Sequence, residues 1–287
     1  MDARKTWLGW AYLAPSLLLV GILAIGLGYV IEYSLHELDI ATYRLRDAYS
    51  LGNYADIATR PVYRVVLWRS VLGAILVTLI TLALAFPYAY ALTRSDSPAL
   101  RKALLVALFL PFFIGQVVRA YGWLIVLGQQ GIVNQALGGL GLPPLDLIYN
   151  FGAVVFGLTQ YMLPFAVLLI LPAMAAIPRD MERASEGLGA SWPATFRHVV
   201  IPMARPGLVG AGIVVFTLTL TDFAMPEILG GGSNDFIASA IYDSFFQISN
   251  AGLGAALSVA LVFVGSVFVA GFFWLSPATT LNAGGGR

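Results

Sequence analysis

The sequence contains no cysteine and only two histidines, His36 and His198. Without cysteine the chain cannot form a disulfide, a thiolate metal site or a cysteine nucleophile. The histidines lie far apart, in different loops, so no HExxH-type metal site is available and we expect no bound metal. The sequence also lacks a GxxxxGK[ST] motif and a nucleophile elbow. We therefore expect a chain that neither binds ATP through a P-loop nor acts as an enzyme.

Charge is scarce as well. Only 11% of the 287 residues are charged, and 16 Lys and Arg against 15 Asp and Glu give a net charge of +1. No basic field therefore indicates nucleic acid as a partner. Hydrophobic residues make up 59% of the chain, whereas soluble domains contain about 45–50% apolar and about 25% charged residues. This composition is typical of a membrane protein.

Long apolar runs predict how the chain crosses the membrane, because a spanning helix needs about 20 mostly apolar residues. The first run is too long for the core of a signal peptide, which has about 7–15 residues, so we interpret it as an uncleaved span. We predict an all-α membrane protein, a single transmembrane domain over residues 1–287. Its six spans are expected at about 8–33, 66–93, 103–127, 151–174, 207–229 and 252–275.

Basic residues predict the orientation, because cytosolic loops carry an excess of Lys and Arg. With the N-terminus inside, four basic residues lie outside, all between 36 and 64, and loops 128–150 and 230–251 hold none. Both termini are therefore expected in the cytosol. The basic residues then on the cytosolic side are Arg4, Lys5, Arg94, Arg101, Lys102, Arg179, Arg183, Arg197, Arg205 and Arg287.

The long cytosolic loop, residues 175–206, contains the signals of a short helix. Pro178 suits a helix start, and Asp180 and Glu182 follow in the first turn, where the helix dipole favours acids. Gly189 allows a left-handed helix end. A short helix with small residues can lie in another protein's groove. The alternative is an ordinary solvated loop between spans.

The order of residues in this loop is more specific. RASEGLGASWPATFRHVVIP, residues 183–202, resembles the "EAA" loop of permease subunits of bacterial ABC importers. FPYAYALTRS at 86–95 is similar to the end of the second span in that family. VVRAYGWLIVLGQQGIVNQAL at 117–137 and TDFAMPEILGG at 221–231 are similar to its polyamine branch. The resemblance covers about residues 50–275.

The resemblance implies a type I ABC importer permease fold in a multi-pass protein of the bacterial inner membrane. It implies a second permease subunit, two ATPase subunits that carry ATP and Mg²⁺, and an external solute-binding protein as partners. The 178–202 loop would form a coupling helix that docks into the ATPase. The residues expected to couple are Glu182, Arg183, Ala184, Ser185, Gly189, Ala190 and Pro202.

The loop departs from the family pattern at one position. Aligned on Gly189 and Pro202, the family's glutamate falls on Arg183, and Glu182 stands one residue earlier. Two interpretations stay open: Glu182 substitutes through a slightly rotated helix, or Arg183 meets an acid on this chain's own partner.

Ionisable residues at membrane depth are candidates for a substrate path, because such charges face protein or a wet cavity. Asp222 and Glu227 lie near the end of the fifth predicted span, and Arg119 lies within the third. The aromatic residues Tyr121, Trp123 and Phe223 could line a path for a cation. The alternative is structural: Arg119 pairs with Asp222 or Glu227, and the aromatic residues face lipid or the interface.

The branch resemblance favours a polyamine such as spermidine or putrescine as substrate, and the acids agree with a cation. Opines, other amines and ferric iron remain alternatives. A secondary transporter or channel is another hypothesis, but it predicts an internal repeat, which the sequence does not show, and leaves the cytosolic loop unexplained. An intramembrane enzyme would need a nucleophile–base pair or metal ligands.

Overall fold

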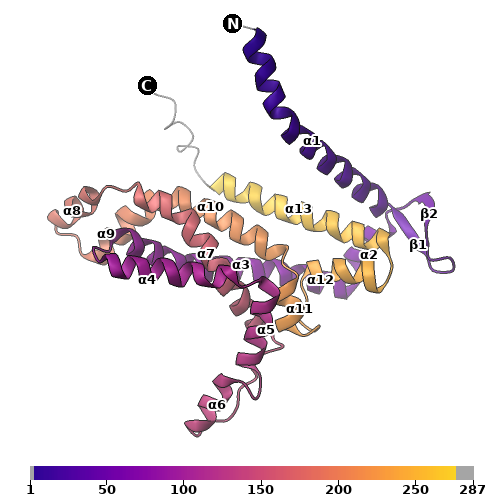
Figure 1. The fold of residues 1–287 in the computed structure, drawn as a ribbon. Coiled ribbons are helices and arrows are strands. Elements are labelled where there is room, and N and C mark those ends of the chain that lie inside the picture. Colours follow the sequence, from indigo (N-terminus) through magenta and orange to yellow (C-terminus); the bar gives the residue numbers. More distant parts are fainter. Residues whose placement is uncertain (1–2, 276–287) are drawn as a thin grey trace. The chain divides into compact units, whose positions relative to one another are not determined.

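The computed structural model describes residues 3–275, and the side chains from 13 to 274 (Figure 1). Arg4, Lys5 and Arg287, which contribute to the predicted charge bias, lie outside the described side chains. The chain divides into two compact units. One contains Met1–Arg64 with Ala240–Phe263, and the other contains Val65–Ser239 with Val264–Arg287.

The first unit holds the N-terminal helix α1 (Ala3–Ser34) and a small part with short elements. That part is a hairpin of β1 (His36–Asp39) and β2 (Arg44–Tyr49), followed by α2 (Gly52–Thr59). Buried Asn53 fastens α2, since its amide donates to the carbonyl oxygens of Ser34 and His36 at 3.0 and 2.9 Å. The hairpin is a local exception to the predicted all-α fold.

The second unit is built from helices around α7. The chain enters it through α3 (Pro61–Arg94) and leaves it within α12 (Ile237–Tyr242). The first unit then holds η3 (Asp243–Gln247) and the first half of α13 (Ala251–Leu275), and the rest of α13 belongs to the second unit. The elements between α3 and α12 are α4 (Pro98–Phe109), η1 (Leu110–Phe113), α5 (Gln116–Leu127), α6 (Ile132–Gly139), α7 (Phe151–Ala175), α8 (Arg179–Gly187), α9 (Trp192–Thr195), η2 (Phe196–Val200), α10 (Ile201–Leu220) and α11 (Ala224–Gly230).

The core of this unit lies along α7 and α10. Buried side chains such as Met162, Ile170 and Val215 fill it. Gly207 lets the two helices approach closely, because a Cβ at this position would stand 2.6 Å from the Cβ of Ala173. Small residues at such crossings are how membrane helices pack without a hydrophobic driving force between them.

The predicted spans agree with the helices where the chain is uniformly apolar. Among the described residues, five helices are long and apolar enough to cross a membrane: Leu13–Ser34, Pro61–Arg94, Phe151–Ala175, Trp192–Leu220 and Ala251–Trp274. A sixth crossing exists if the bent pair Pro98–Phe113 and Gln116–Gly139 forms one span.

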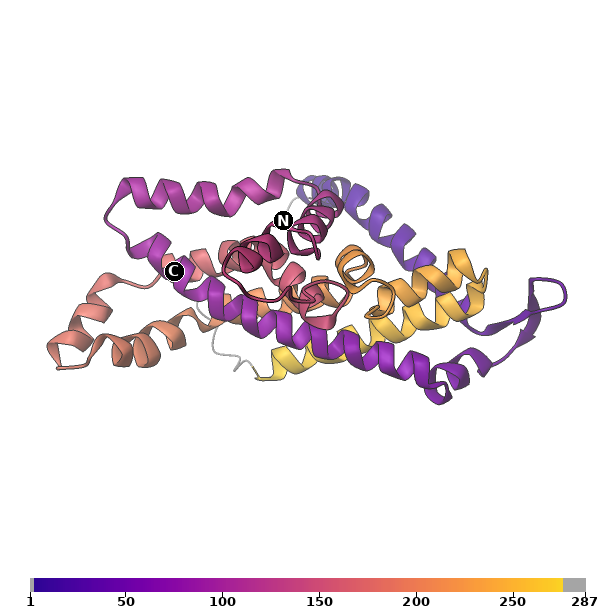
Figure 2. The ribbon, with the colours of Figure 1, turned by 90° about the horizontal axis from the view of Figure 1, so that it is seen from below.

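The third predicted span, 103–127, is not one helix. It bends by 102° between η1 and α5, so that α5 and α6 turn away from α4 (Figures 1 and 2). Pro111 within η1 and Gly115 at the N-cap of α5 account for the break, because proline and glycine are the usual causes of sharp kinks.

The fifth predicted span, 207–229, also differs. α10 begins earlier, at Ile201, and ends at Leu220, and α11 is a separate short helix. The break lies at 221–223, so Pro226 stands in the first turn of α11 instead of breaking a longer helix. A proline is tolerated there because first-turn residues need no backbone donor.

Candidate functional site

The predicted cytosolic helix exists as α8. It begins one residue after Pro178, and Asp180 and Glu182 occupy its first turn. Its end is a Schellman motif, in which the N–H of Gly189 donates to Glu186 O at 2.9 Å and that of Ala190 to Ser185 O at 3.2 Å. Gly189 has φ +85°, a left-handed angle that glycine adopts without strain.

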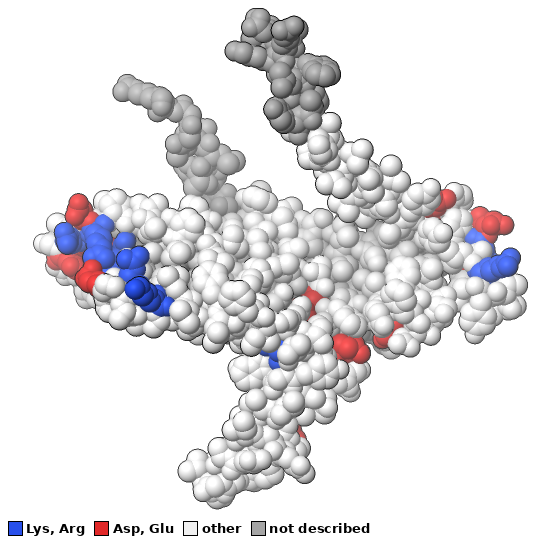
Figure 3. Space-filling model, viewed as in Figure 1, with Lys and Arg blue, Asp and Glu red and all other residues white. Residues whose placement is uncertain are grey.

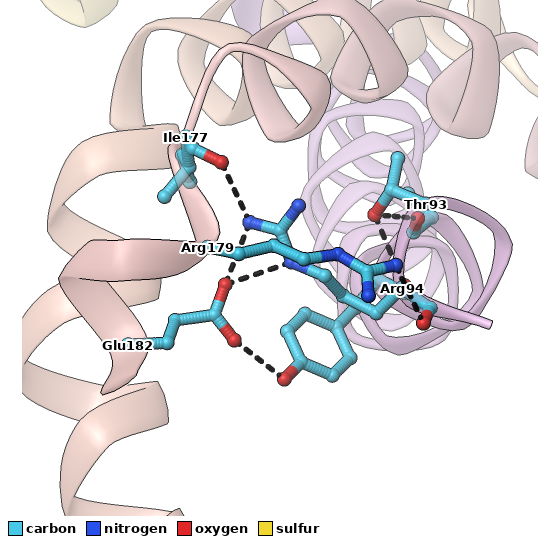
Figure 4. Close-up of polar contacts among 7 residues, drawn as sticks. Thr93, Arg94, Ile177, Arg179 and Glu182 are labelled. Carbon is cyan, nitrogen blue, oxygen red and sulfur yellow. Dashed lines mark hydrogen bonds and ion pairs between the residues drawn. The ribbon is translucent and has the colours of Figure 1, made fainter. Parts of the chain in front are cut away.

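Glu182 faces the protein's own second span (Figure 4). Its Oε1 accepts from Arg94 Nε at 2.7 Å and lies 2.6 Å from Arg94 Nη2. Its Oε2 accepts from the Tyr90 hydroxyl at 2.8 Å. The Glu182 and Arg94 side chains keep only 13% and 14% of their surface exposed. Arg94 also donates to Ile177 O at 2.8 Å, which ties in the turn before α8.

The charged side chains of Asp180, Arg183 and Glu186, also on α8, are exposed. Arg183 is exposed, and its guanidinium lies 3.6 Å from the Asp180 carboxylate of the same helix. Ala184 and Gly189 are exposed, and the Leu188 side chain is 90% exposed at the tip. The surface around this end carries most of the charge of the unit (Figure 3). The exposed basic residues of α4, α8, η2 and the start of α10 are Arg101, Lys102, Arg179, Arg183, Arg197 and Arg205.

Aromatic packing supports the stretch that follows α8. Trp192 stacks on Phe196, with ring centroids 5.0 Å apart, and Phe196 meets Tyr90 and Phe86 edge-on. The Ser185 hydroxyl lies 2.9 Å from that of Thr195. Ser185 thus belongs to the inner face of α8. Of the other residues expected to couple, Ala190 is half-buried and Pro202 is exposed in the first turn of α10.

A second polar cluster joins the two helix breaks. Asp222, which is 8% exposed, accepts from the amide of Gln116, the first residue of α5. Its other oxygen accepts from Met225 N at 3.0 Å and so caps α11. The carboxylate therefore holds the broken fifth span against the broken third span.

Arg119 does not form the ion pair with Asp222 or Glu227 that the structural alternative expected. Its guanidinium donates to the carbonyl oxygens of Pro111 and Ile114, which lie at the break in the third span. It also lies over the Tyr161 ring, 5.2 Å from the centroid. Arg119 thus closes the break within its own span.

The remaining path candidates are less buried. Trp123 donates to Gln160 at 3.4 Å and packs edge-on against Phe156. Tyr121 is 53% exposed on α5, and Glu227 is exposed in the first turn of α11. Phe223 is half-buried at the N-cap of α11. The structure thus brings Asp222 close to α5 and leaves Tyr121 and Glu227 on the surface.

Two residues of these clusters were not predicted from the sequence, Tyr90 and Arg94, whereas Gln116 was a candidate either for the path or for a bond between helices, and it forms such a bond. Tyr90 and Arg94 stand four apart at the end of α3, within the FPYAYALTRS stretch, and therefore share a helix face. Gln116 follows Gly115 directly. The spacing was a usable signal for the first pair, but nothing local points to a partner 88 residues away.

Comparison with known proteins identifies the chain's relatives. Residues 66–280 match the model of the family described as binding-protein-dependent transport system inner membrane component. The chain belongs to this family. It is a multi-pass protein of the bacterial inner membrane and an ABC importer permease, as the loop at 183–202 indicated.

Curated relatives agree with this assignment. The chain is 30% identical over 264 residues to the spermidine/putrescine transport system permease protein PotB of Salmonella typhimurium, covering 90% of this chain and 87% of the relative. It is 29% identical over 248 residues to the inner membrane ABC transporter permease protein YdcU of Escherichia coli, covering 82% and 79%. It is 30% identical over 287 residues to the trehalose transport system permease protein SugA of Mycobacterium tuberculosis, covering 97% and 91%.

Solved structures share the fold. A chain of the bacterial alginate ABC transporter, crystallised with an alginate pentasaccharide-bound periplasmic protein, aligns with TM-score 0.79 over 97% of both chains at 17% identity. A chain of the MetNI methionine ABC transporter aligns with TM-score 0.51 over 71% of this chain and 93% of that one, at 19% identity. This confirms the importer permease fold.

Proposed function

We propose that this chain forms half of the translocation pathway of an ATP-driven importer and couples to the ATPase through α8. The observation that carries the proposal is the projecting α8 end, whose Schellman turn exposes small and apolar side chains in a chain that belongs to the importer family. An exposed Leu188 beside Ala184 suits a groove in a partner, because docking removes apolar surface of both proteins from water, which is favourable.

The orientation follows from the charges. Arg101, Lys102, Arg179 and Arg183 gather at the α8 end of the second unit (Figure 3), and basic residues accumulate on the cytosolic side. We place α8 in the cytosol, where two ATPase subunits carry ATP and Mg²⁺. The chain itself needs no cofactor and no catalytic residue for this role.

The pathway is proposed to lie between this chain and a second permease subunit. One face of α5 exposes the apolar residues Val117, Val118, Tyr121 and Ile125, next to the Gln116–Asp222 contact. A partner helix on this face would enclose the polar cluster at the helix breaks. An external solute-binding protein would deliver the substrate on the side of α6 and α11.

The proposed substrate is a polyamine, spermidine or putrescine. This choice is supported by the relatives named for spermidine/putrescine transport and by two acids, Asp222 and Glu227, around the fifth-span break. Asp222 already holds Gln116 and caps α11. Because Glu227 is exposed in the first turn of α11, it is the acid that a cation from solution can reach first, with Tyr121, Trp123 and Phe223 as aromatic lining.

The second candidate is an importer permease for another solute, such as an opine, another amine, ferric iron or a sugar. SugA, a trehalose permease by name, matches a larger share of this chain than PotB does. A secondary transporter is the weaker alternative, because the family works with a binding protein.

Reconstitution tests the proposal. The chain is co-expressed with its neighbouring ATPase, second permease and binding-protein genes, purified, and placed in proteoliposomes with radiolabelled spermidine, putrescine or trehalose. We expect uptake of a polyamine that requires both ATP and the binding protein. Uptake of trehalose alone would replace the substrate, and uptake without ATP would overturn the importer assignment.

A further inference from the structure

Two polar side chains, one turn apart, attach α8 to the cytosolic end of α3. Glu182 binds Arg94 and Tyr90, as described above. Arg179, three residues earlier, donates to the backbone carbonyl of Arg94 at 3.1 Å and to Asp96 at 2.9 Å. Residues three apart lie close together on a helix surface, so these two side chains together attach α8 to its own chain (Figure 4).

The contact fixes both position and rotation. The Glu182 carboxylate uses both oxygens, one for the guanidinium and one for the Tyr90 hydroxyl, and these donors stand one turn apart on α3. Charge-assisted bonds of this kind are directional and stronger than neutral ones. Because the groups are mostly buried, separating them would leave a charge without a partner in a poorly solvated site.

The linked helix is long enough to carry movement across the membrane. α3 contains 34 residues, about 51 Å at 1.5 Å per residue. Arg94 stands in its last turn, a place where the helix dipole favours a cation. Arg94 also binds Ile177 O, so the α7–α8 turn, α8 and α3 meet at one guanidinium.

We infer that Glu182 is a positioning residue that links the coupling helix to the second span, and that it does not contact the ATPase. Arg183, the exposed neighbour of Glu182 on α8, is the residue placed to meet an acid of the ATPase. This inference rests on the proposed function, and it decides between the two interpretations of the Glu182–Arg183 departure. ATPase closure moves α8, and the Glu182–Arg94 bond moves α3 with it.

The test separates docking from transmission. Glu182→Ala, Arg94→Ala and the milder Tyr90→Phe are each introduced into the co-expressed importer. Three quantities are measured: the ATPase subunits retained on purification, ATP hydrolysis with and without substrate-loaded binding protein, and uptake in proteoliposomes. The control is Arg60→Ala, which removes the exposed Arg60–Asp56 ion pair (2.8 Å) in the first unit.

We expect the Glu182 and Arg94 variants to keep the full ATPase complement. In these two variants, both the stimulation of ATP hydrolysis by the binding protein and the uptake rate should fall at least tenfold. In Tyr90→Phe both quantities should fall less. The exchange Glu182→Arg with Arg94→Glu should recover part of the stimulation, which a merely unfolded helix would not allow. Arg60→Ala should behave like the unmodified protein.

Three results would overturn the inference. Loss of ATPase subunits from Glu182→Ala but not from Arg94→Ala would make Glu182 a docking residue. Normal stimulation and uptake in both variants would remove the link altogether. Failure of the exchange to recover any stimulation would mean that the pair does not act through its mutual contact. If the unmodified chain retains no ATPase at all, the proposed function fails instead, and the two failures are thereby distinguished.

Discussion

Gln116 donates a hydrogen bond to Asp222, and the two residues stand at the breaks of two different spans. Gln116 is the first residue after the 102° bend in the third span. Asp222 lies between α10 and α11 and caps the latter through Met225 N. Interrupted helices at membrane depth are tolerated where other groups satisfy the freed backbone. In this chain the Asp222 carboxylate accepts from the free N–H of Met225 and also binds Gln116, and it thereby joins the breaks of the fifth and third spans.

The first prediction concerns that bond. Gln116→Leu and Asp222→Asn should each lower thermal stability in detergent and uptake, because a hydrogen bond to a charged group contributes about 1.5–3 kcal/mol. The double variant should be little worse than either single one, since each removes the same charge-assisted hydrogen bond. Asp222→Ala should be worse than Asp222→Asn because it also removes the cap on α11. Gln135→Leu, an exposed amide with a local bond to Gln130 O, is the control. Additive losses in the double variant would contradict the link.

The second prediction separates Glu227 from Asp222. Glu227 is exposed in the first turn of α11, so Glu227→Gln should change stability less than Asp222→Asn does. Uptake of spermidine should fall roughly tenfold, the factor that a loss of about 1.4 kcal/mol corresponds to. Asp47→Asn, an exposed acid on β2, serves as control. Unchanged spermidine uptake at several concentrations would remove Glu227 from the substrate path.

The third prediction concerns topology. Reporter fusions after Arg101 and after Asp180 should be read as cytosolic, and fusions near Gly139 and Asn234 as external. The reason is the gathering of basic residues at the α8 end (Figure 3). A cytosolic reading near Asn234 would contradict the count of six crossings, in which the bent pair of α4 with η1 and α5 with α6 is one span.

The sequence predicted the elements that depend on residues close together in the chain better than those that depend on distant residues. Spans 151–174 and 252–275 agree with α7 and α13 to within one residue at each end, because a continuous apolar run decides them. The end of α8 followed from one residue, Gly189, whose left-handed angle a glycine signals by itself. Local chemistry was sufficient at these places.

Elements that depend on distant partners were not predictable in the same way. The Glu182–Arg94 pair joins residues 88 apart, and Gln116–Asp222 joins residues 106 apart. Hydropathy treats 103–127 as one span because Pro111 and Gly115 are compatible with a membrane helix until packing decides otherwise. The predicted Arg119 pairing was wrong for the same reason: its guanidinium bonds backbone carbonyl oxygens at the bend, which only the folded structure brings within reach.

The fourth prediction tests the α7–α10 packing with two glycines of one helix. A Cβ at Gly207 would lie 2.6 Å from Ala173 Cβ and 3.3 Å from Ile170 Cα. Gly207→Ala should therefore lower the midpoint of thermal unfolding, since overpacking typically costs about 1–3 kcal/mol. A Cβ at Gly210 meets nothing within 4 Å, so Gly210→Ala should be neutral or stabilise the helix by up to about 1 kcal/mol. Equal midpoints for the two variants would contradict the close crossing.

The fifth prediction concerns the end of the coupling helix. Gly189 has φ +85°, and a β-branched residue is a genuine outlier in that region. Gly189→Val should cost about 1 kcal/mol or more in local strain, unwind the Schellman turn and move Leu188 and Ala190. We expect the variant to insert and to pair with the second permease, yet to lose ATPase subunits on purification.

Matched variants make this test specific. Gly189→Asn should retain more ATPase than Gly189→Val, because asparagine visits the left-handed region more readily than a branched residue. Arg197→Ala, exposed in η2 beyond the short helix, should keep the full complement. Loss of ATPase subunits from Gly189→Val also differs from the expected behaviour of Glu182→Ala. That variant should keep the ATPase subunits and lose the stimulation of ATP hydrolysis by the binding protein. If Gly189→Val retains a full ATPase complement and transports normally, α8 does not dock the ATPase, and movement must reach the spans through another segment.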